Sequence, residues 1–171
     1  MDKLTRNPAP QVCLRPFVPA DRAAMLELLT DAAVAKTYML PVFSAREEAV
    51  PLFERLLALS QDAARFVRCI EKDGAPVGIL NDVEMTGETV ELGWAVLPAH
   101  WGQGCATAAL AAAVPQLFAR GFSAVRAGAF CENAASLRVM EKCGMTRIDL
   151  TEDIVYRGKT YRCVYCELTR P

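Results

Sequence analysis

The segment Trp101–Thr107 has the residue types and spacing that suit binding of a phosphorylated ligand. It carries glycine at positions 102 and 104 and lies between an apolar segment and an alanine-rich one. Because glycine has no Cβ, it allows a tight turn and a close approach of the backbone to a ligand. A helix that begins at about position 104 offers free N–H groups and the positive end of its dipole to a pyrophosphate. The segment therefore predicts a phosphate-binding loop.

This turn alone leaves the ligand open. A dinucleotide fingerprint has a third small residue where this chain has Thr107, and a Walker A loop has a Gly-Lys-Ser/Thr sequence that the chain lacks. Isolated glycine motifs also occur in turns that only join a strand to a helix. A phosphate-binding loop and a purely structural turn both fit the segment.

A second segment, Asn133–Gly144, contains a polar start and a glycine end. Asn133 can cap a helix, Ser136 is three residues further along, and Gly144 can end that helix. This capping role is enough to explain the residues structurally. It does not explain why two such segments follow each other in this order.

Three carboxylates are candidate general bases. Glu91 ranks first. On a strand it shares a face with Gly93 and Ala95, and these small residues leave room for a groove that could hold a substrate. A solvated or ion-paired strand glutamate is the alternative interpretation. Asp82 and Glu84 are weaker candidates for the same role.

His100 and Cys131 are reactive residue types near these segments. His100 is the sole histidine and lies beside a turn, which favours an exposed turn residue over a general base. Cys131 follows an expected strand, but no His-Asp pattern supports an acyl-cysteine intermediate.

The seven cysteines are scattered and odd in number, which indicates buried free thiols in a reducing compartment. Cys163 and Cys166 form the one close pair. On a strand they point to opposite faces, so the sequence predicts no metal site.

The composition places these residues in one ordinary globular domain. The chain has 171 residues, of which 53% are hydrophobic and 23% charged, and its net charge is −1. This balance does not favour nucleic-acid or anionic-lipid partners. No stretch approaches the roughly 18 apolar residues of a membrane span, and the first residues contain no apolar signal core. We expect a cytoplasmic protein without a membrane partner.

The hydrophobic periodicity predicts the elements that position the candidate residues. One helix opens at Pro19–Asp21, and Ser44 with Glu47 forms a capping-box signature for a second that ends near Leu59. The other expected elements are strands over 12–17, 66–70, 77–80, 90–96, 124–130, 145–150 and 161–169, and helices over 104–120 and 133–143. Pro115 should bend the longer helix. The order indicates an α/β or α+β fold with a central mixed sheet, in which residues 90–130 form a right-handed parallel strand-helix-strand unit.

Because Trp101–Thr107 and Asn133–Gly144 occur together and in this order, the chain resembles the GNAT acetyltransferase superfamily, most closely its RimJ/RimL-like branch. The specific matches are Glu91–Trp94, Trp101–Thr107 and Asn133–Met145, and the resemblance runs from Leu14 to the last strand. It implies a single N-acetyltransferase domain over residues 1–171, with a core of about 11–170. The implied fold is a GNAT-like central mixed, mostly antiparallel sheet flanked by helices, with the parallel unit around the cofactor.

The resemblance implies acetyl-CoA (coenzyme A) as the cofactor. Its pantetheine arm would lie between the strands 90–96 and 124–130, pair with the first of them near Val96 and contact Asn133. Ser136 would lie near the sulfur and protonate the leaving thiolate, with Glu91 as the base, directly or through a water. The residues implied to form the pyrophosphate loop are Trp101, Gly102, Gln103, Gly104, Cys105, Ala106 and Thr107.

The implied reaction is direct transfer of an acetyl group to a primary amine, either a protein N-terminus or a small molecule. Two residues depart from the family pattern: Trp101 replaces the usual Arg or Gln, and Ala108 stands where the branch often has Glu. A non-catalytic acyl-CoA-binding sensor or interaction module is the alternative, and a nucleotide-binding α/β domain is a third. The protein is expected to be a monomer or a homodimer.

Overall fold

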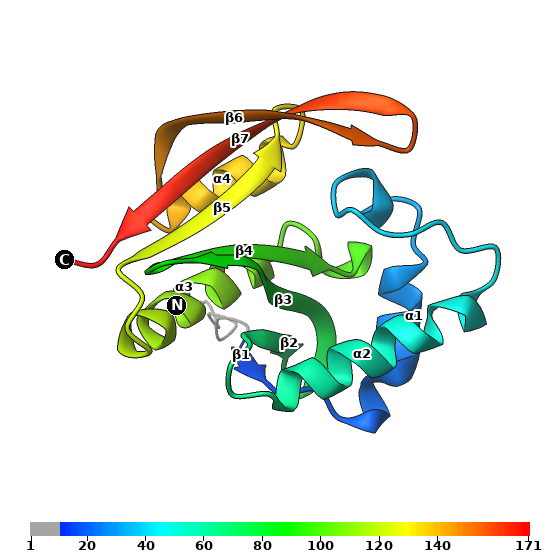
Figure 1. The fold of residues 1–171 in the computed structure, drawn as a ribbon. Coiled ribbons are helices and arrows are strands. Elements are labelled where there is room, and N and C mark those ends of the chain that lie inside the picture. Colours follow the sequence, from blue (N-terminus) through cyan, green and yellow to red (C-terminus); the bar gives the residue numbers. More distant parts are fainter. Residues whose placement is uncertain (1–10) are drawn as a thin grey trace, which may run out of the picture.

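The computed structural model describes residues 11–171, which form one seven-stranded sheet with helices on both faces (Figure 1). The strands are β1 (Val12–Arg15), β2 (Val67–Lys72), β3 (Ala75–Thr86), β4 (Thr89–Val96), β5 (Ala124–Phe130), β6 (Thr146–Tyr156) and β7 (Lys159–Thr169). The helices are α1 (Arg22–Leu29), α2 (Val50–Gln61), α3 (Cys105–Ala119) and α4 (Ala134–Lys142). Short 3₁₀ turns occupy Pro19–Asp21, Val34–Lys36, Arg46–Ala49 and Pro98–His100.

The strand order in the sheet is β1-β2-β3-β4-β5-β7-β6. Every neighbouring pair is antiparallel except β4 and β5, which run parallel and are joined by α3. The expected order of elements and the mixed, mostly antiparallel sheet with one parallel unit are thus confirmed.

The parallel pair is joined along only part of its length. The ladder runs from Thr89 opposite Ala124 to Leu92 opposite Ala127. Beyond it, 93–96 of β4 and 128–130 of β5 continue without pairing to each other, and Figure 1 shows the two ribbons diverging. The backbone polar groups along this divergence lack a strand partner on that side, which a ligand can supply.

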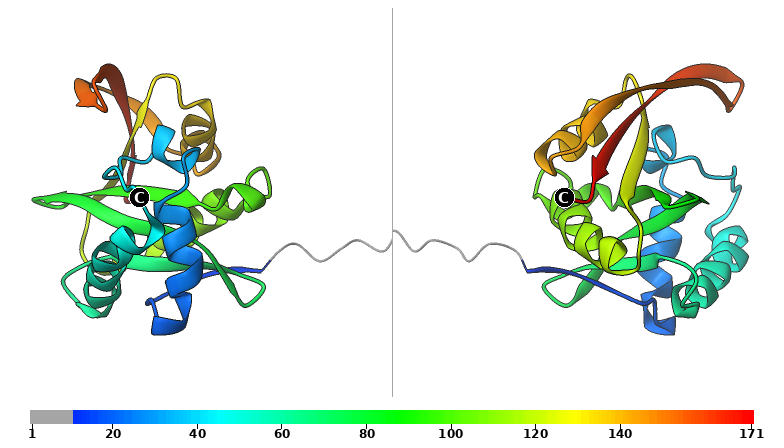
Figure 2. Two further views of the ribbon diagram at one scale, coloured as in Figure 1. Left: turned by 90° about the vertical axis from the view of Figure 1, so that its right-hand side faces the viewer. Right: turned by 60° about the vertical axis from the view of Figure 1, so that its left-hand side comes forward.

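Two hydrophobic layers hold the helices against the sheet. Leu110 and Leu117 of α3 are fully buried among side chains of β4 and β5, whereas Met25 of α1 and Phe53 of α2 pack against the opposite face. The two views in Figure 2 show α1 and α2 on one side of the sheet and α3 on the other. Both faces of the sheet are therefore covered by a packed core.

Several sequence expectations require correction. The capping box of Ser44 and Glu47 is absent; the backbone N–H of Ser44 donates to the carboxylate of Glu48 at 2.8 Å, and α2 begins only at Val50, after a 3₁₀ turn. β3 and β6 extend well beyond the predicted ranges. Pro115 lies inside α3, as the sequence predicts, and the bend expected there stays a prediction.

The cysteines follow the prediction only in part. All seven are free thiols, but Cys13 and Cys131 are exposed rather than buried. Cys163 and Cys166 do face opposite sides of β7, the first toward Phe130 and the second toward the α3 layer. No helix among residues 11–171 is long and apolar enough to cross a membrane.

Candidate active site

A cavity of about 520 Å³ is lined by the end of β4, beyond the point at which its ladder with β5 stops. Its walls come from four parts of the chain: the end of β4, the loop before α3 with the first turn of that helix, one face of α4 from Asn133 to Lys142, and residues 33–38 between α1 and α2. A concave site of this size, with a few converging polar groups, is typical of ligand binding. Of the predicted site residues, the cavity wall contains Val96, Trp101, Gly102, Gly104, Cys105, Ala106, Thr107, Asn133 and Ser136.

The loop before α3 adopts the conformation that its glycines permit. Gly102 and Gly104 have φ angles of 69° and 77°, in the left-handed region that side chains disfavour. Gly104 is the N-cap of α3 and supplies no side-chain cap, so the first N–H groups of the helix stay open toward the cavity. The indole of Trp101 donates to the carbonyl of Val96 at 2.7 Å and fixes the loop on the end of β4. The geometry suits an anionic ligand.

Gln103 is the one predicted loop residue that lies outside the cavity wall. Its side chain accepts a hydrogen bond from Lys72 Nζ and donates to the carbonyl of Ala99 at 3.0 Å. Its side chain therefore ties the loop to β2 and to the preceding turn.

Asn133 and Ser136 are joined at the start of α4. Asn133 Oδ1 accepts from the backbone N–H of Ser136 at 3.1 Å, and its Nδ2 donates to Ser136 Oγ at 2.9 Å. The hydroxyl of Ser136 has no hydrogen-bond acceptor among residues 11–171, so its own proton is free to be donated into the cavity.

Glu91 lies outside the cavity wall, on the face of β4 that carries Gly93. It stands directly opposite Glu84 of β3 and Arg126 of β5, which pairs in turn with Glu167 at 2.9 Å. Burial, reinforced by the negative charge of Glu84, raises the pKa of the Glu91 carboxyl, while Arg126 opposes this shift. A carboxylate with a raised pKa is a better general base near neutral pH.

Asp82 is a structural residue and not a base. It is buried, forms an ion pair with Arg65 at 2.6 Å and accepts a hydrogen bond from the backbone N–H of Phe66 at 2.8 Å. These partners fix β2 to β3 and leave the carboxylate no role in proton transfer. Glu84, by contrast, is exposed beside Glu91.

His100 is half-buried in the cavity wall, and is therefore not the exposed turn residue that the sequence suggested. Its Nδ1 is buried and has no hydrogen-bond partner in the described part of the chain. Cys131 is exposed at the end of β5 and does not line the cavity.

Tyr38 is a cavity residue that sequence reasoning missed. Its ring lies close to Gly93, and its hydroxyl donates to Asn81 Oδ1 at 2.7 Å. Burial raises the pKa of this phenol, so it stays protonated at neutral pH. The segment around it has no helical or strand periodicity, so the sequence carries no signal for its place.

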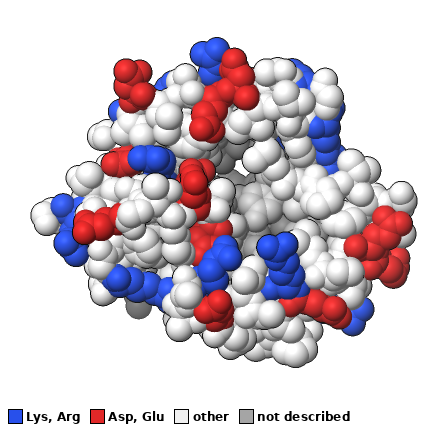
Figure 3. All heavy atoms as spheres, in the orientation of Figure 1, with Lys and Arg blue, Asp and Glu red and all other residues white. Residues whose placement is uncertain are grey.

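The tip of the β6–β7 hairpin closes over residues 35–41, a contact that we term the strap. The hydroxyl of Tyr156 donates to the carbonyl of Ala35 at 2.7 Å and accepts from the backbone N–H of Leu40 at 3.2 Å. Arg157 adds bonds to the carbonyls of Leu40 and Pro41. Figure 3 shows a hollow on this face, with acidic side chains along one side of it.

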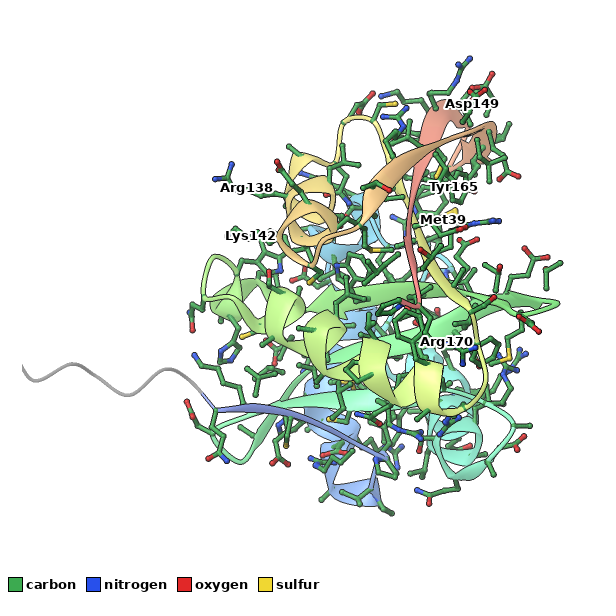
Figure 4. All side chains as sticks on the ribbon, turned by 90° about the vertical axis from the view of Figure 1, so that its left-hand side faces the viewer. Met39, Arg138, Lys142, Asp149, Tyr165 and Arg170 are labelled. Atoms are coloured by element: carbon green, nitrogen blue, oxygen red, sulfur yellow. The ribbon has the colours of Figure 1, made fainter. Side chains whose placement is uncertain are left out.

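The opposite end of the cavity is basic. Arg138 and Lys142, one turn apart on α4, line it together with the loop before α3. Figure 4 labels both on the side of α4 next to that loop. The site thus has a cationic end and an acidic face, joined by the divergent strands.

Known proteins share this architecture. Residues 11–146 match the family described as "Acetyltransferase (GNAT) domain". The uncharacterized N-acetyltransferase YoaA of Bacillus subtilis is 24% identical over 155 residues, which cover 88% of this chain and 88% of that protein.

Solved structures with the same fold include RimJ of Mycobacterium smegmatis in complex with CoA-disulfide. It is 23% identical, with a TM-score of 0.80, and the match covers 95% of this chain and 83% of that one. The spermidine N-acetyltransferase of Vibrio cholerae, in complex with CoA and spermine, is 17% identical with a TM-score of 0.77, over 93% and 95% of the two chains.

Proposed function

The chain belongs to the family of GNAT acetyltransferases, and from this premise we propose that it transfers an acetyl group from acetyl-CoA to a primary amine. The observation that carries the proposal is one continuous cavity with a phosphate-binding loop at one end and the Ser136 hydroxyl in its wall. Two neighbours of the same fold, RimJ and the spermidine acetyltransferase, were solved with CoA-containing ligands.

The loop before α3 would hold the coenzyme pyrophosphate through backbone N–H groups from Gly102 to Thr107. The glycine conformations and the open first turn of α3 support this placement. The pantetheine arm would then follow 93–96 of β4, whose edge toward β5 has no strand partner. The amide groups of pantetheine can donate to and accept from the unpaired backbone groups of this edge.

The reaction begins when the nitrogen of a neutral amine attacks the thioester carbonyl carbon. A C–N bond forms, the C–S bond breaks, and the departing thiolate takes up a proton. Ser136 would supply that proton. The hydrogen bond from Asn133 Nδ2 to its oxygen supports this role, because it leaves the hydroxyl hydrogen free. The nearby N-terminus of α4 also favours negative charge on the sulfur.

The proton that the amine loses needs a base on the acceptor side. Glu91 suits this role, since its pKa is raised and it lies on the face of β4 that carries Gly93. Glu91 would take the proton directly or through a water molecule. Tyr38 remains protonated and orients the acceptor rather than deprotonating it.

The acceptor face selects for a positively charged amine of narrow cross-section. Glu84, Glu91 and Glu152 supply carboxylates there, and amines are mostly protonated before they bind. The strap between Tyr156 and residues 35–41 would narrow the path by which the amine reaches the cavity. This favours a small molecule or an extended chain end as the acceptor.

Acetyl-CoA turnover with a panel of amines tests the proposal. The purified protein is incubated with acetyl-CoA and with polyamines, amino acids or short peptides with free N-termini, and thiol release is measured. We expect turnover with at least one amine. Acetyl-CoA binding without turnover on any amine would favour a sensor, and preferential binding of NAD or ATP would favour a nucleotide-binding domain.

A further inference from the structure

Two cations on α4 line the cavity beside the loop before α3 and have no partner among the described residues. Arg138 and Lys142 are both exposed, both line the cavity, and are spaced four residues apart on one helix face. Among residues 11–171 neither forms an ion pair or a side-chain hydrogen bond. By contrast, three arginines of the sheet pair with carboxylates: Arg15 with Asp21, Arg126 with Glu167 and Arg162 with Asp153.

The helix itself does not account for this pair. Like charges at i and i+4 repel each other and destabilise a helix slightly. Lys142 lies in the last turn of α4, where the helix dipole favours a cation, but Arg138 lies in the middle of the helix. Two neighbouring cations that line a cavity are instead an arrangement that suits a phosphate group.

Coenzyme A carries three phosphates, of which the backbone loop accounts for two. The N–H groups between Gly102 and Thr107 suit the pyrophosphate and need no side-chain cation. The third phosphate, on the 3′ oxygen of the ribose, is a monoester with nearly two negative charges at neutral pH. Arg138 and Lys142, one helix turn apart, line the same cavity as the loop, and the neighbouring Cys143 Sγ lies 3.4 Å from the carbonyl oxygen of Thr107.

We propose that Arg138 and Lys142 bind the ribose 3′-phosphate and make the protein select coenzyme A over 3′-dephospho-coenzyme A. This inference rests on the proposed function, because it assumes coenzyme A in the cavity. The planar guanidinium of Arg138 binds two phosphate oxygens at once, and the ammonium of Lys142 adds a point charge. This preference for coenzyme A does not depend on the acetyl group or on the amine acceptor, so it can be measured by binding alone.

The test compares affinities for coenzyme A and 3′-dephospho-coenzyme A by isothermal titration calorimetry. We expect the unmodified protein to bind coenzyme A at least about tenfold more tightly, the contribution of one charge-assisted hydrogen bond or more. In the double variant Arg138→Gln/Lys142→Gln this ratio should fall to near one. The affinity for 3′-dephospho-coenzyme A should stay the same, because the pyrophosphate loop is intact.

Two control variants separate this site from general charge effects. Arg55→Gln removes an exposed cation from α2, away from the cavity, and should keep the full selectivity. Lys72→Gln removes the cation that bonds to Gln103 on the outer side of the loop, and should also keep it.

Three results would overturn the inference. They are equal affinity of the unmodified protein for the two ligands, full selectivity in the double variant, or loss of selectivity in Lys72→Gln instead. A failure of the proposed function looks different. Acetyl-CoA would then bind without turnover on any amine, or neither ligand would bind, whereas the selectivity ratio is measured from binding alone.

Discussion

Asn133 holds Ser136 at the start of α4 through two hydrogen bonds that run in opposite directions. Its side-chain oxygen accepts from the Ser136 backbone N–H at 3.1 Å, and its side-chain nitrogen donates to Ser136 Oγ at 2.9 Å. The first bond caps the helix and the second orients the hydroxyl. One residue therefore serves both the fold and the proposed proton donor.

Asn133→Asp separates these two contributions. Aspartate caps a helix as well as asparagine does, but it replaces the amide donor with an acceptor. The Ser136 hydroxyl then donates to Asp, and we expect kcat to fall on the order of tenfold to a hundredfold at nearly constant melting temperature. Steady-state kinetics and thermal unfolding measure both quantities. An unchanged kcat would mean that the direction of the hydroxyl does not matter.

Gly104→Ala places a side chain in the left-handed conformation at the start of α3. No atom of the described chain lies within 4 Å of the new Cβ, so the cost is backbone strain of about 1–2 kcal/mol in the free energy of unfolding. Relaxation of that strain moves the N–H groups of the loop, and the Kd for coenzyme A should rise about tenfold.

Gly121→Ala is the matched control for this change. Gly121 follows the other end of α3 with a φ angle of 100° and open space around it, away from the cavity wall. Gly121→Ala should lower the free energy of unfolding by a similar amount, while the Kd for coenzyme A stays unchanged. If both variants weakened coenzyme A binding equally, the conformation of the loop at Gly104 would not be what the ligand requires.

Glu91→Gln should make the protein more stable and less active. The raised pKa of Glu91 means that its ionised form is disfavoured in the folded state. Its contribution to stability is fully present below the ordinary pKa of the carboxyl and is lost as pH rises through the raised value. The variant should therefore have the higher melting temperature at about pH 8 and lose this advantage near pH 4.

The kinetic part of this prediction uses a pH–rate profile. In the unmodified protein kcat/KM should fall as pH drops through the raised pKa of Glu91, because the base is then protonated. Glu91→Gln should lower kcat and remove this acid limb. A profile that keeps its shape in the variant would assign the base to another group.

Tyr156→Phe should loosen the strap and weaken acceptor binding. The change removes the hydroxyl that bonds to Ala35 and Leu40, leaving a backbone N–H and a carbonyl without that partner. We expect a loss of about 1–3 kcal/mol in local opening free energy, seen as faster hydrogen exchange at residues 34–40, and a higher KM for the amine.

Tyr161→Phe is the control on the same hairpin. Tyr161 stacks on Phe130 with ring centroids 4.5 Å apart, and its hydroxyl has no hydrogen bond to the described residues. This variant should leave both exchange and KM unchanged. If both variants raise KM equally, the hairpin acts through its aromatic packing and not through the strap.

The sequence predicts the elements with strong local patterns. β5 was predicted at its observed bounds, and the helix ends at Gly121 and Gly144 have the positive φ angles expected of C-terminal glycines. The glycine turn before α3 and the cap at Asn133 are predictable for the same reason, because each depends on residues close together in the chain.

The acceptor side depends on contacts that no local pattern records. Tyr156 and Ala35 are 121 positions apart, and Tyr38 reaches Asn81 across 43 positions. The outer part of β3, from Val83 onward, is exposed and forms a strand only because β4 pairs with it. These features follow from the assembled sheet rather than from residue periodicity.

Ser136→Ala tests the central claim most directly. Acetyl-CoA turnover with the best amine acceptor and the Kd for coenzyme A are measured on the same preparation of the variant and of the unmodified protein. If Ser136 protonates the leaving thiolate, kcat falls on the order of a hundredfold while the Kd changes less than about twofold. An unchanged kcat at unchanged affinity would contradict the account.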